Sequence, residues 1–139
     1  MSSVASMVQA FRAHGRKITP QRRLIFQALA VGQRHPTAEQ IYQEVAAVLG
    51  DTSRTTVYNT LHELVALGEL QEIDLGDGRT RYDSDPIPHH HLHCLRCHAL
   101  IDLHEQFAGL ELAPEAREGF TIVARRVIFD GYCPACQDQ

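Results

Sequence analysis

The stretch "SRTTVYNTLHELVALGEL", residues 53–70, decides how the first half of this chain folds. Ser53 is a residue type that caps helix N-termini, and Gly68 is the type that most often follows a helix end. Between them, apolar residues recur at the spacing of a helix that buries one face, and these are Val57, Leu61, Leu64 and Val65. The stretch therefore predicts an amphipathic helix between Ser53 and Gly68.

The opposite face of this helix is polar. It carries Arg54, Thr55, Tyr58, Asn59 and His62. Hydrogen-bond donors, acceptors and an aromatic ring in this arrangement suit base edges and phosphates in a DNA major groove. Many surface helices carry the same residue types, so the helix alone leaves a solvated face open as the alternative.

Three more helices are predicted before this one and a β-hairpin after it. The first ends near Gly15, the second begins at Thr19 with proline in its first turn, and the third begins with a capping box of Thr37 and Gln40. The third is expected to end at Gly50 and to bury Ile41, Val45, Val48 and Leu49. Residues 76–78, Gly-Asp-Gly, separate two short strand-like runs, which indicates a hairpin. This order is typical of a winged helix-turn-helix.

Charge and proline content divide the chain. Residues 1–69 hold seven Lys and Arg against five Asp and Glu, a formal charge of +2, whereas residues 70–139 hold six against twelve, giving −6. "SDPIP", residues 84–88, interrupts regular structure. We predict an α+β chain with a winged-helix DNA-binding domain over 1–84 and a second, smaller domain over 85–139. The basic residues Arg16, Lys17, Arg22 and Arg23 are expected to face phosphates.

The second domain is expected to be built mainly from strands. Residues 89–95 and 99–103 have strand character, a helix is predicted somewhere between Glu105 and Glu118, and residues 121–129 are rich in β-forming types.

Four cysteines fall in two Cys-x-x-Cys pairs, Cys94/Cys97 and Cys133/Cys136. Four thiolates in two knuckles make a closed tetrahedral zinc site, and two redox dithiols or surface thiols without a role are the alternatives. The motifs of zinc deaminases and of His-Glu-x-x-His metalloproteases are absent from the sequence. We therefore predict structural Zn²⁺ and no enzymatic activity, with a zinc-bound dithiol oxidoreductase as the rival from another class.

Histidines gather directly before the first cysteine pair. Strand alternation places His89 and His91 on one face, with Asp83 before them and Asp102 on the expected partner strand. Nitrogen and carboxylate ligands together suit a divalent metal such as iron, manganese or zinc. Isolated histidines, such as His14, His62, His98 and His104, are expected to be solvated side chains.

The motifs together resemble the ferric-uptake-regulator (Fur) family of metal-dependent bacterial repressors. They are "RKITPQRRLIFQAL" (16–29), "RHPTAEQIYQEV" (34–45), "SRTTVYNTLHELVALGEL" (53–70), "HHHLHCLRC" (89–97) and "YCPAC" (132–136). The resemblance implies a homodimer that binds a palindromic double-stranded DNA operator, with residues 85–139 forming a small α/β, metal-binding dimerisation domain. It also implies a structural zinc on the four cysteines and a regulatory metal at the hinge. From the polar helix face and the basic residues described above, we predict that DNA is contacted by Lys17, Arg54, Thr55, Tyr58 and Asn59.

The peroxide-sensing (PerR) branch of this family offers three histidines and two aspartates to the regulatory metal. By resemblance these ligands correspond to His35, Asp83, His89, His91 and Asp102. The metal would be Fe²⁺ or Mn²⁺, and His35 and His89 are the side chains that peroxide would oxidise. A manganese, iron or zinc uptake regulator of the same family is the alternative.

Some positions depart from the family pattern. Pro88 and Arg125 stand where many relatives have histidines of an additional site, which leaves His90 and Glu111 as partial ligands. His98 replaces a glycine common after the first cysteine pair. No secretory signal or apolar run of ~18 residues is present, so we expect a cytoplasmic protein without a membrane partner.

Overall fold

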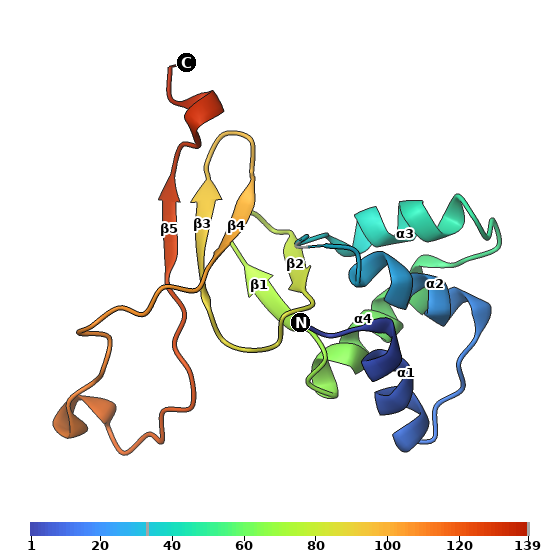
Figure 1. The fold of residues 1–139 in the computed structure, drawn as a ribbon, viewed down its shortest axis with the longest axis horizontal. Coiled ribbons are helices and arrows are strands. Elements are labelled where there is room, and N and C mark those ends of the chain that lie inside the picture. Colours follow the sequence, from blue (N-terminus) through green and yellow to red (C-terminus); the bar gives the residue numbers. More distant parts are fainter. Residues whose placement is uncertain (33, 139) are drawn as a thin grey trace. The chain divides into compact units, whose positions relative to one another are not determined.

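The computed structural model describes residues 1–32 and 34–138 and divides into two compact units, Met1–Pro86 and Ile87–Gln139. The predicted boundary was after residue 84. Each unit has its own secondary structure, helices and a hairpin in the first and a three-stranded sheet in the second (Figure 1). No helix among the described residues is long and apolar enough to span a bilayer.

The first unit contains four helices and a two-stranded hairpin. Its elements are α1 (Val4–Ala13), α2 (Pro20–Leu29), α3 (Ala38–Ala46), α4 (Arg54–Ala66), β1 (Gln71–Asp74) and β2 (Thr80–Asp83). The predicted N-caps Thr19, Thr37 and Ser53 each accept a hydrogen bond from the backbone N–H three residues on. These caps satisfy N–H groups that have no partner within the helix, which is why each helix begins at the expected residue.

The core of the first unit lies between the four helices. It includes the fully buried side chains of Met7, Phe11, Ile25, Phe26, Ile41, Val57, Leu61 and Leu64. The rings of Phe11 and Phe26 meet edge to face, with centroids 5.0 Å apart. The apolar stripe of α4 is thus buried, and its polar face is free for contacts outside the unit.

The prediction that α3 continues to Gly50 with Val48 buried was wrong. The helix ends at Ala46, and Val48 is 67% exposed. The N–H of Val48 donates to the carbonyl of Val45, three residues back, and the Leu49 N–H donates to the same oxygen. The three-residue bond of Val48 makes the chain turn more tightly than in an α-helix, so the Val48 side chain points to solvent and not to the core.

A short extended segment lies beside the hairpin. β1 and β2 pair in antiparallel fashion, with Gln71 opposite Asp83. On the other side of β2, Thr37 forms an isolated bridge with Arg81, and the Tyr82 N–H donates to the Pro36 carbonyl at 2.9 Å. Continued in the same antiparallel register, this pairing brings His35 opposite Asp83.

The second unit is built on a sheet in the order β4-β3-β5. The strands are β3 (His90–Cys94), β4 (Leu100–Leu103) and β5 (Ile128–Gly131), with short 3₁₀ helices η1 (Pro114–Arg117) and η2 (Pro134–Cys136). β3 pairs antiparallel with β4 and parallel with β5 (Figure 1). The α+β class predicted from the sequence is therefore confirmed.

Strand register gives the two faces of this sheet different chemistry. Leu92 pairs with Ile101 on one side and with Phe129 on the other, so three apolar residues form one row across a face. His91 pairs with Asp102 and His93 with Asp130, which places these polar pairs on the other face. One face thus has an apolar row across its centre, and the other carries two pairs of an imidazole and a carboxylate.

The helix predicted between residues 105 and 118 was wrong. In this segment only η1 is helical, as a single 3₁₀ turn, and Gly109 has a φ of +89°. A residue in that conformation cannot continue a right-handed helix, and Pro114 removes a further backbone donor. The β-rich expectation for 121–129 was also too broad, because the strand begins only at Ile128.

Candidate metal centres and nucleic-acid interface

The four cysteines come together at one end of the second sheet. Cys94 ends β3, and the Leu95 N–H donates to the Gly131 carbonyl of β5 at 2.8 Å. This parallel pairing brings the two knuckles together, and all four sulfurs lie within 4.8 Å of one another. Cys97 Sγ is 3.8 Å from Cys133 Sγ, a contact between the two pairs. The cysteines therefore form one four-sulfur cluster, which argues against two separate dithiols.

The electrostatics of the cluster favour a bound cation. Hydrogen bonds from backbone N–H groups lower the pKa of Cys94 to about 5. The largest contribution comes from the Cys133 N–H, whose nitrogen lies 3.4 Å from Cys94 Sγ. The neighbouring Cys133 sulfur, and then burial, raise the pKa of Cys136 to about 12. Four thiolates this close repel one another, so they cannot all ionise without a compensating positive charge. A tetrahedral Zn²⁺, whose preferred ligands are thiolates, supplies that charge.

His98 occupies a strained position in the first knuckle. It has a φ of +65°, and its N–H donates to the Cys94 carbonyl at 3.0 Å. A left-handed conformation costs a residue with a Cβ about 1–2 kcal/mol, a penalty that glycine does not have. His98 therefore stands in place of the family's common glycine at a position where the backbone favours glycine.

We expect His98→Gly to stabilise the zinc-loaded protein by about 1 kcal/mol, because the left-handed strain is relieved. Thermal unfolding of the zinc-loaded form measures this as a rise in Tm. Arg96→Gly is the control, since Arg96 is in the same knuckle but is not among the residues with positive φ. Glycine there should lower Tm; a lower Tm for His98→Gly as well would contradict the expectation.

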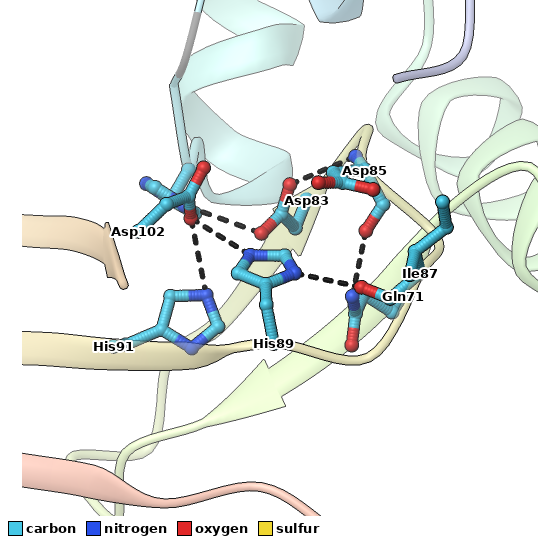
Figure 2. A network of polar contacts seen from close by, with 8 residues as sticks. Gln71, Asp83, Asp85, Ile87, His89, His91 and Asp102 are labelled. Atoms are coloured by element: carbon cyan, nitrogen blue, oxygen red, sulfur yellow. Dashed lines mark hydrogen bonds and ion pairs between the residues drawn. The ribbon is translucent and has the colours of Figure 1, made fainter. Parts of the chain in front are cut away.

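A second cluster of metal-binding residue types lies on the polar face of the same sheet. His89 Nε2 is 2.9 Å and His91 Nε2 is 3.3 Å from the same oxygen, Oδ1 of Asp102. The side chains are 1–4% exposed. Figure 2 shows both rings directed toward the Asp102 carboxylate. The sequence predicted these three residues, and the second unit brings all three together.

The Ile87 carbonyl orients the His89 ring. His89 Nδ1 lies 2.7 Å from this oxygen, and a carbonyl can only accept, so Nδ1 carries the proton. In the neutral ring, Nε2 then presents its lone pair toward the cluster. Metal-ligating histidines are typically held in this way, by a carbonyl or carboxylate on the other ring nitrogen. The donor set and its orientation fit a divalent cation.

In the first unit, His35 and Asp83 form a buried pair. His35 Nε2 lies 3.3 Å from Asp83 Oδ2, and the two side chains are 4% and 3% exposed. The other carboxylate oxygen of Asp83 accepts from the Asp85 N–H at 2.9 Å (Figure 2). The pairing between the extended segment and β2 explains why residues so distant in sequence meet.

Two features were missed by the sequence analysis. His104 is exposed, as expected, but its ring also stacks on His89 with centroids 4.8 Å apart. His93 Nδ1 is 2.9 Å from Asp130 Oδ1, a pair created by the parallel register of β3 and β5. The stack follows from extending the expected β3–β4 pairing by one residue, whereas the His93–Asp130 pair depends on the β3–β5 pairing, which the sequence does not indicate.

The additional metal site, for which the sequence offers only His90 and Glu111 as partial ligands, is incomplete in the structure as well. His90 Nδ1 accepts from the Val127 N–H at 2.9 Å, so in the neutral ring Nε2 carries the proton and has no lone pair for a metal. Arg125 forms an ion pair with Glu111. A guanidinium thus neutralises the carboxylate, and these residues do not fit a third metal.

The polar face of α4 is exposed as predicted at Arg54, Thr55, Tyr58 and Asn59. Arg54 Nη2 lies 2.9 Å from Glu39 Oε1 of α3, and this hydrogen bond is the main cause that lowers the pKa of Glu39 to about 2. Near the start of α2, Lys17 lines a depression of about 460 Å³ together with Arg16, Thr19, Arg22 and Thr56. Basic side chains around a helix N-terminus are suited to a phosphate.

Comparisons with known proteins agree with these features. The sequence profile of the Ferric uptake regulator family matches residues 13–129. The peroxide-responsive repressor PerR of Staphylococcus aureus (strain USA300) is 33% identical over 138 residues, which cover 99% of this chain and 90% of that protein.

Solved structures give the same result. A zinc-bound manganese uptake regulator superposes with a TM-score of 0.67 at 29% identity, covering 91% of this chain and 98% of that one. The Helicobacter pylori ferric uptake regulator Fur superposes with a TM-score of 0.75 at 18% identity, covering 99% and 95%, which supports the fold alone. With its capped helices, hairpin and paired cysteine knuckles, this chain belongs to the ferric uptake regulator family.

Proposed function

We propose that this protein is a metal-dependent, DNA-binding transcriptional repressor that responds to peroxide. The observation that carries the proposal is the buried cluster of His89, His91 and Asp102, in which a backbone carbonyl orients the His89 ring for a metal. The 33% identical relative is a peroxide-responsive repressor, which supports the finer assignment. The chain is not expected to be an enzyme.

Zn²⁺ is proposed to bind Cys94, Cys97, Cys133 and Cys136 permanently. The second unit has few buried apolar side chains of its own, since the hydrophobic core residues in contact with one another all belong to the first. A small domain of this kind commonly relies on a structural metal for its stability. The zinc would connect the end of β3 to the end of the chain.

The regulatory metal is proposed to take ligands from both domains. His35 and Asp83 would come from the winged-helix domain over 1–84, and His89, His91 and Asp102 from the dimerisation domain over 85–139. Each set is already assembled within its own unit by hydrogen bonds and ion pairs. Ligands shared in this way bind best in one relative orientation of the domains, so the metal shifts the population toward the DNA-binding form.

Peroxide response is proposed to act through the ligand histidines. Fe²⁺ in the regulatory site would promote cleavage of the O–O bond of peroxide, with one oxygen ending on a ligand imidazole, which gives up two electrons overall, and the other leaving as water. Mn²⁺ would support DNA binding without reacting. His35 and His89 are the rings we propose to be oxidised. An oxygen atom added to either ring would disturb its donor nitrogen and weaken metal binding, so that DNA is released.

We expect oxidation of His35 or His89 only in the Fe²⁺-loaded protein, together with loss of operator binding. Treating Fe²⁺- and Mn²⁺-loaded samples with peroxide, followed by peptide mass spectrometry and a mobility-shift assay, measures both effects. Intact histidines and unchanged DNA binding in the Fe²⁺ form would instead favour a manganese, iron or zinc uptake regulator. A structural relative at 29% identity is a manganese uptake regulator, which is why this alternative is kept.

The DNA partner is proposed to be a palindromic double-stranded operator bound by a homodimer. The row of Leu92, Ile101 and Phe129 supports the dimer, because these side chains are 43–54% exposed on one sheet face. Apolar rows of this kind commonly mark protein interfaces. For DNA, Arg54, Thr55, Tyr58 and Asn59 on α4 would enter the major groove, and Lys17 would contact the backbone.

We expect Tyr58→Ala to lower affinity for the operator by about 10-fold or more, while affinity for unrelated DNA changes little, because an aromatic contact with bases is lost. Lys17→Ala should instead weaken binding to all sequences and reduce the salt slope by about 1, because a phosphate contact is lost. Fluorescence anisotropy over a series of salt concentrations separates the two. Normal operator binding by both variants would show that α4 is misassigned.

A further inference from the structure

Two residues of α3 hold the Arg54 side chain at the start of α4. Arg54 Nε and Nη2 donate to the two carboxylate oxygens of Glu39, at 3.0 and 2.9 Å. The Arg54 guanidinium carbon lies 4.2 Å from the centroid of the Tyr42 ring. Gln43 in turn donates to the Glu39 carboxylate at 3.0 Å. The guanidinium is therefore fixed along one edge and supported on one face.

The opposite end of the guanidinium stays available. Arginine has five N–H donors in a planar fork, and the pair of bonds to Glu39 uses the edge formed by Nε and Nη2. The end formed by Nη1 and Nη2 keeps a complete two-pronged edge, and Nη1 has no hydrogen-bond acceptor within residues 1–32 and 34–138. The Arg54 side chain is 56% exposed, so this edge is open to a partner.

On the basis of the proposed DNA binding, we propose that Arg54 recognises one guanine in each operator half-site through its free Nη1/Nη2 edge. Glu39 and Tyr42 are then positioning residues, which hold the edge in place without touching the base. A two-pronged arginine edge matches the O6 and N7 acceptors that guanine presents in the major groove. No other base presents two acceptors there.

The charge of Glu39 distinguishes this role from a phosphate contact. A carboxylate beside the guanidinium largely cancels its charge, which weakens attraction to the DNA backbone but leaves the geometry of the free edge intact. The arginine also loses less rotamer freedom on binding, because it is already held. The arrangement therefore favours base discrimination over general affinity.

A purely structural role for this ion pair makes a different prediction. Exposed ion pairs usually contribute little to stability, and the Arg54 and Glu39 side chains are 56% and 48% exposed. If the pair only held α3 against α4, its loss would lower thermal stability and affect all DNA sequences alike. The two roles can therefore be separated by comparing operator and random-sequence DNA.

The test is selection of preferred sequences from a randomised duplex library by the metal-loaded protein, in wild-type, Arg54→Lys and Glu39→Gln forms. Wild type should enrich a half-site with an invariant guanine. Arg54→Lys keeps the charge but lacks the fork, so it should lose about 5- to 100-fold of discrimination at that position. Glu39→Gln should relax the same position, while its affinity for random-sequence DNA is unchanged or higher and its Tm is kept.

Glu44→Gln is the matched control, because Arg34 and Glu44 form a similar two-bond pair in the same unit, at 3.0 and 2.8 Å. This variant should keep the wild-type preference at every position. The inference is wrong if Glu39→Gln retains the guanine preference, or if it weakens binding to all duplexes equally. If wild type enriches no sequence at all, the proposed function itself fails.

Discussion

Replacing Cys97 with serine is expected to remove the structural zinc and unfold the second domain. Binding free energies for such zinc sites are about 10–16 kcal/mol, more than the whole stability of many small domains. With one thiolate removed, only three sulfur ligands remain for the zinc. These three lie too close together to ionise freely without the bound cation. Without zinc, the end of β3 and the C-terminal knuckle have little else to hold them together.

Zinc analysis of the purified variant should show a fall from one ion per chain to none. Size-exclusion chromatography should show loss of the dimer, while circular dichroism retains the signal of the four helices. Ala135→Ser is the control, because it introduces the same hydroxyl into the other knuckle at an exposed position and removes no thiolate. A zinc-free Cys97→Ser protein that stays a folded dimer would refute the structural role.

Replacing Asp102 with asparagine is expected to abolish metal-dependent DNA binding without affecting zinc. Asp102 has the central position among the proposed regulatory ligands of the second unit, since one of its oxygens is close to both His89 and His91. An amide has nearly the same shape but no charge. Replacing a residue that only hydrogen-bonds to a metal ligand typically lowers metal affinity about 10- to 100-fold. Loss of a charged ligand should therefore lower Mn²⁺ affinity about 100-fold or more.

The measurements are a Mn²⁺ titration by calorimetry and operator binding with and without Mn²⁺. Asp130→Asn is a close control, because Asp130 also pairs with a histidine of β3, His93, at 2.9 Å and on the same sheet. That variant should keep both metal affinity and DNA binding. Equal Mn²⁺ affinity in Asp102→Asn and wild type would exclude Asp102 as a ligand.

The helix starts of the first unit and the buried stripe of α4 follow from the sequence alone, whereas the end of α3 does not. The N-caps at Thr19, Thr37 and Ser53 and the stripe of α4 depend on hydrogen bonds and spacings within a few residues, so the pattern contains all the information needed. The cysteine spacing likewise indicates a four-thiolate zinc site. The helix predicted within 105–118 was wrong because Gly109 and Pro114 interrupt helical structure there.

Tertiary structure decided which of these groups meet. Only the parallel pairing of β3 with β5 brings the two cysteine pairs into one cluster and sets His93 beside Asp130. The contact between Arg54 and Glu39 depends on how α3 packs against α4. The sequence by itself determined the helix starts, the hairpin and the metal-binding residue types, since these are local properties of the chain. It could not determine their partners, because strand order and helix packing depend on contacts between residues far apart in the chain.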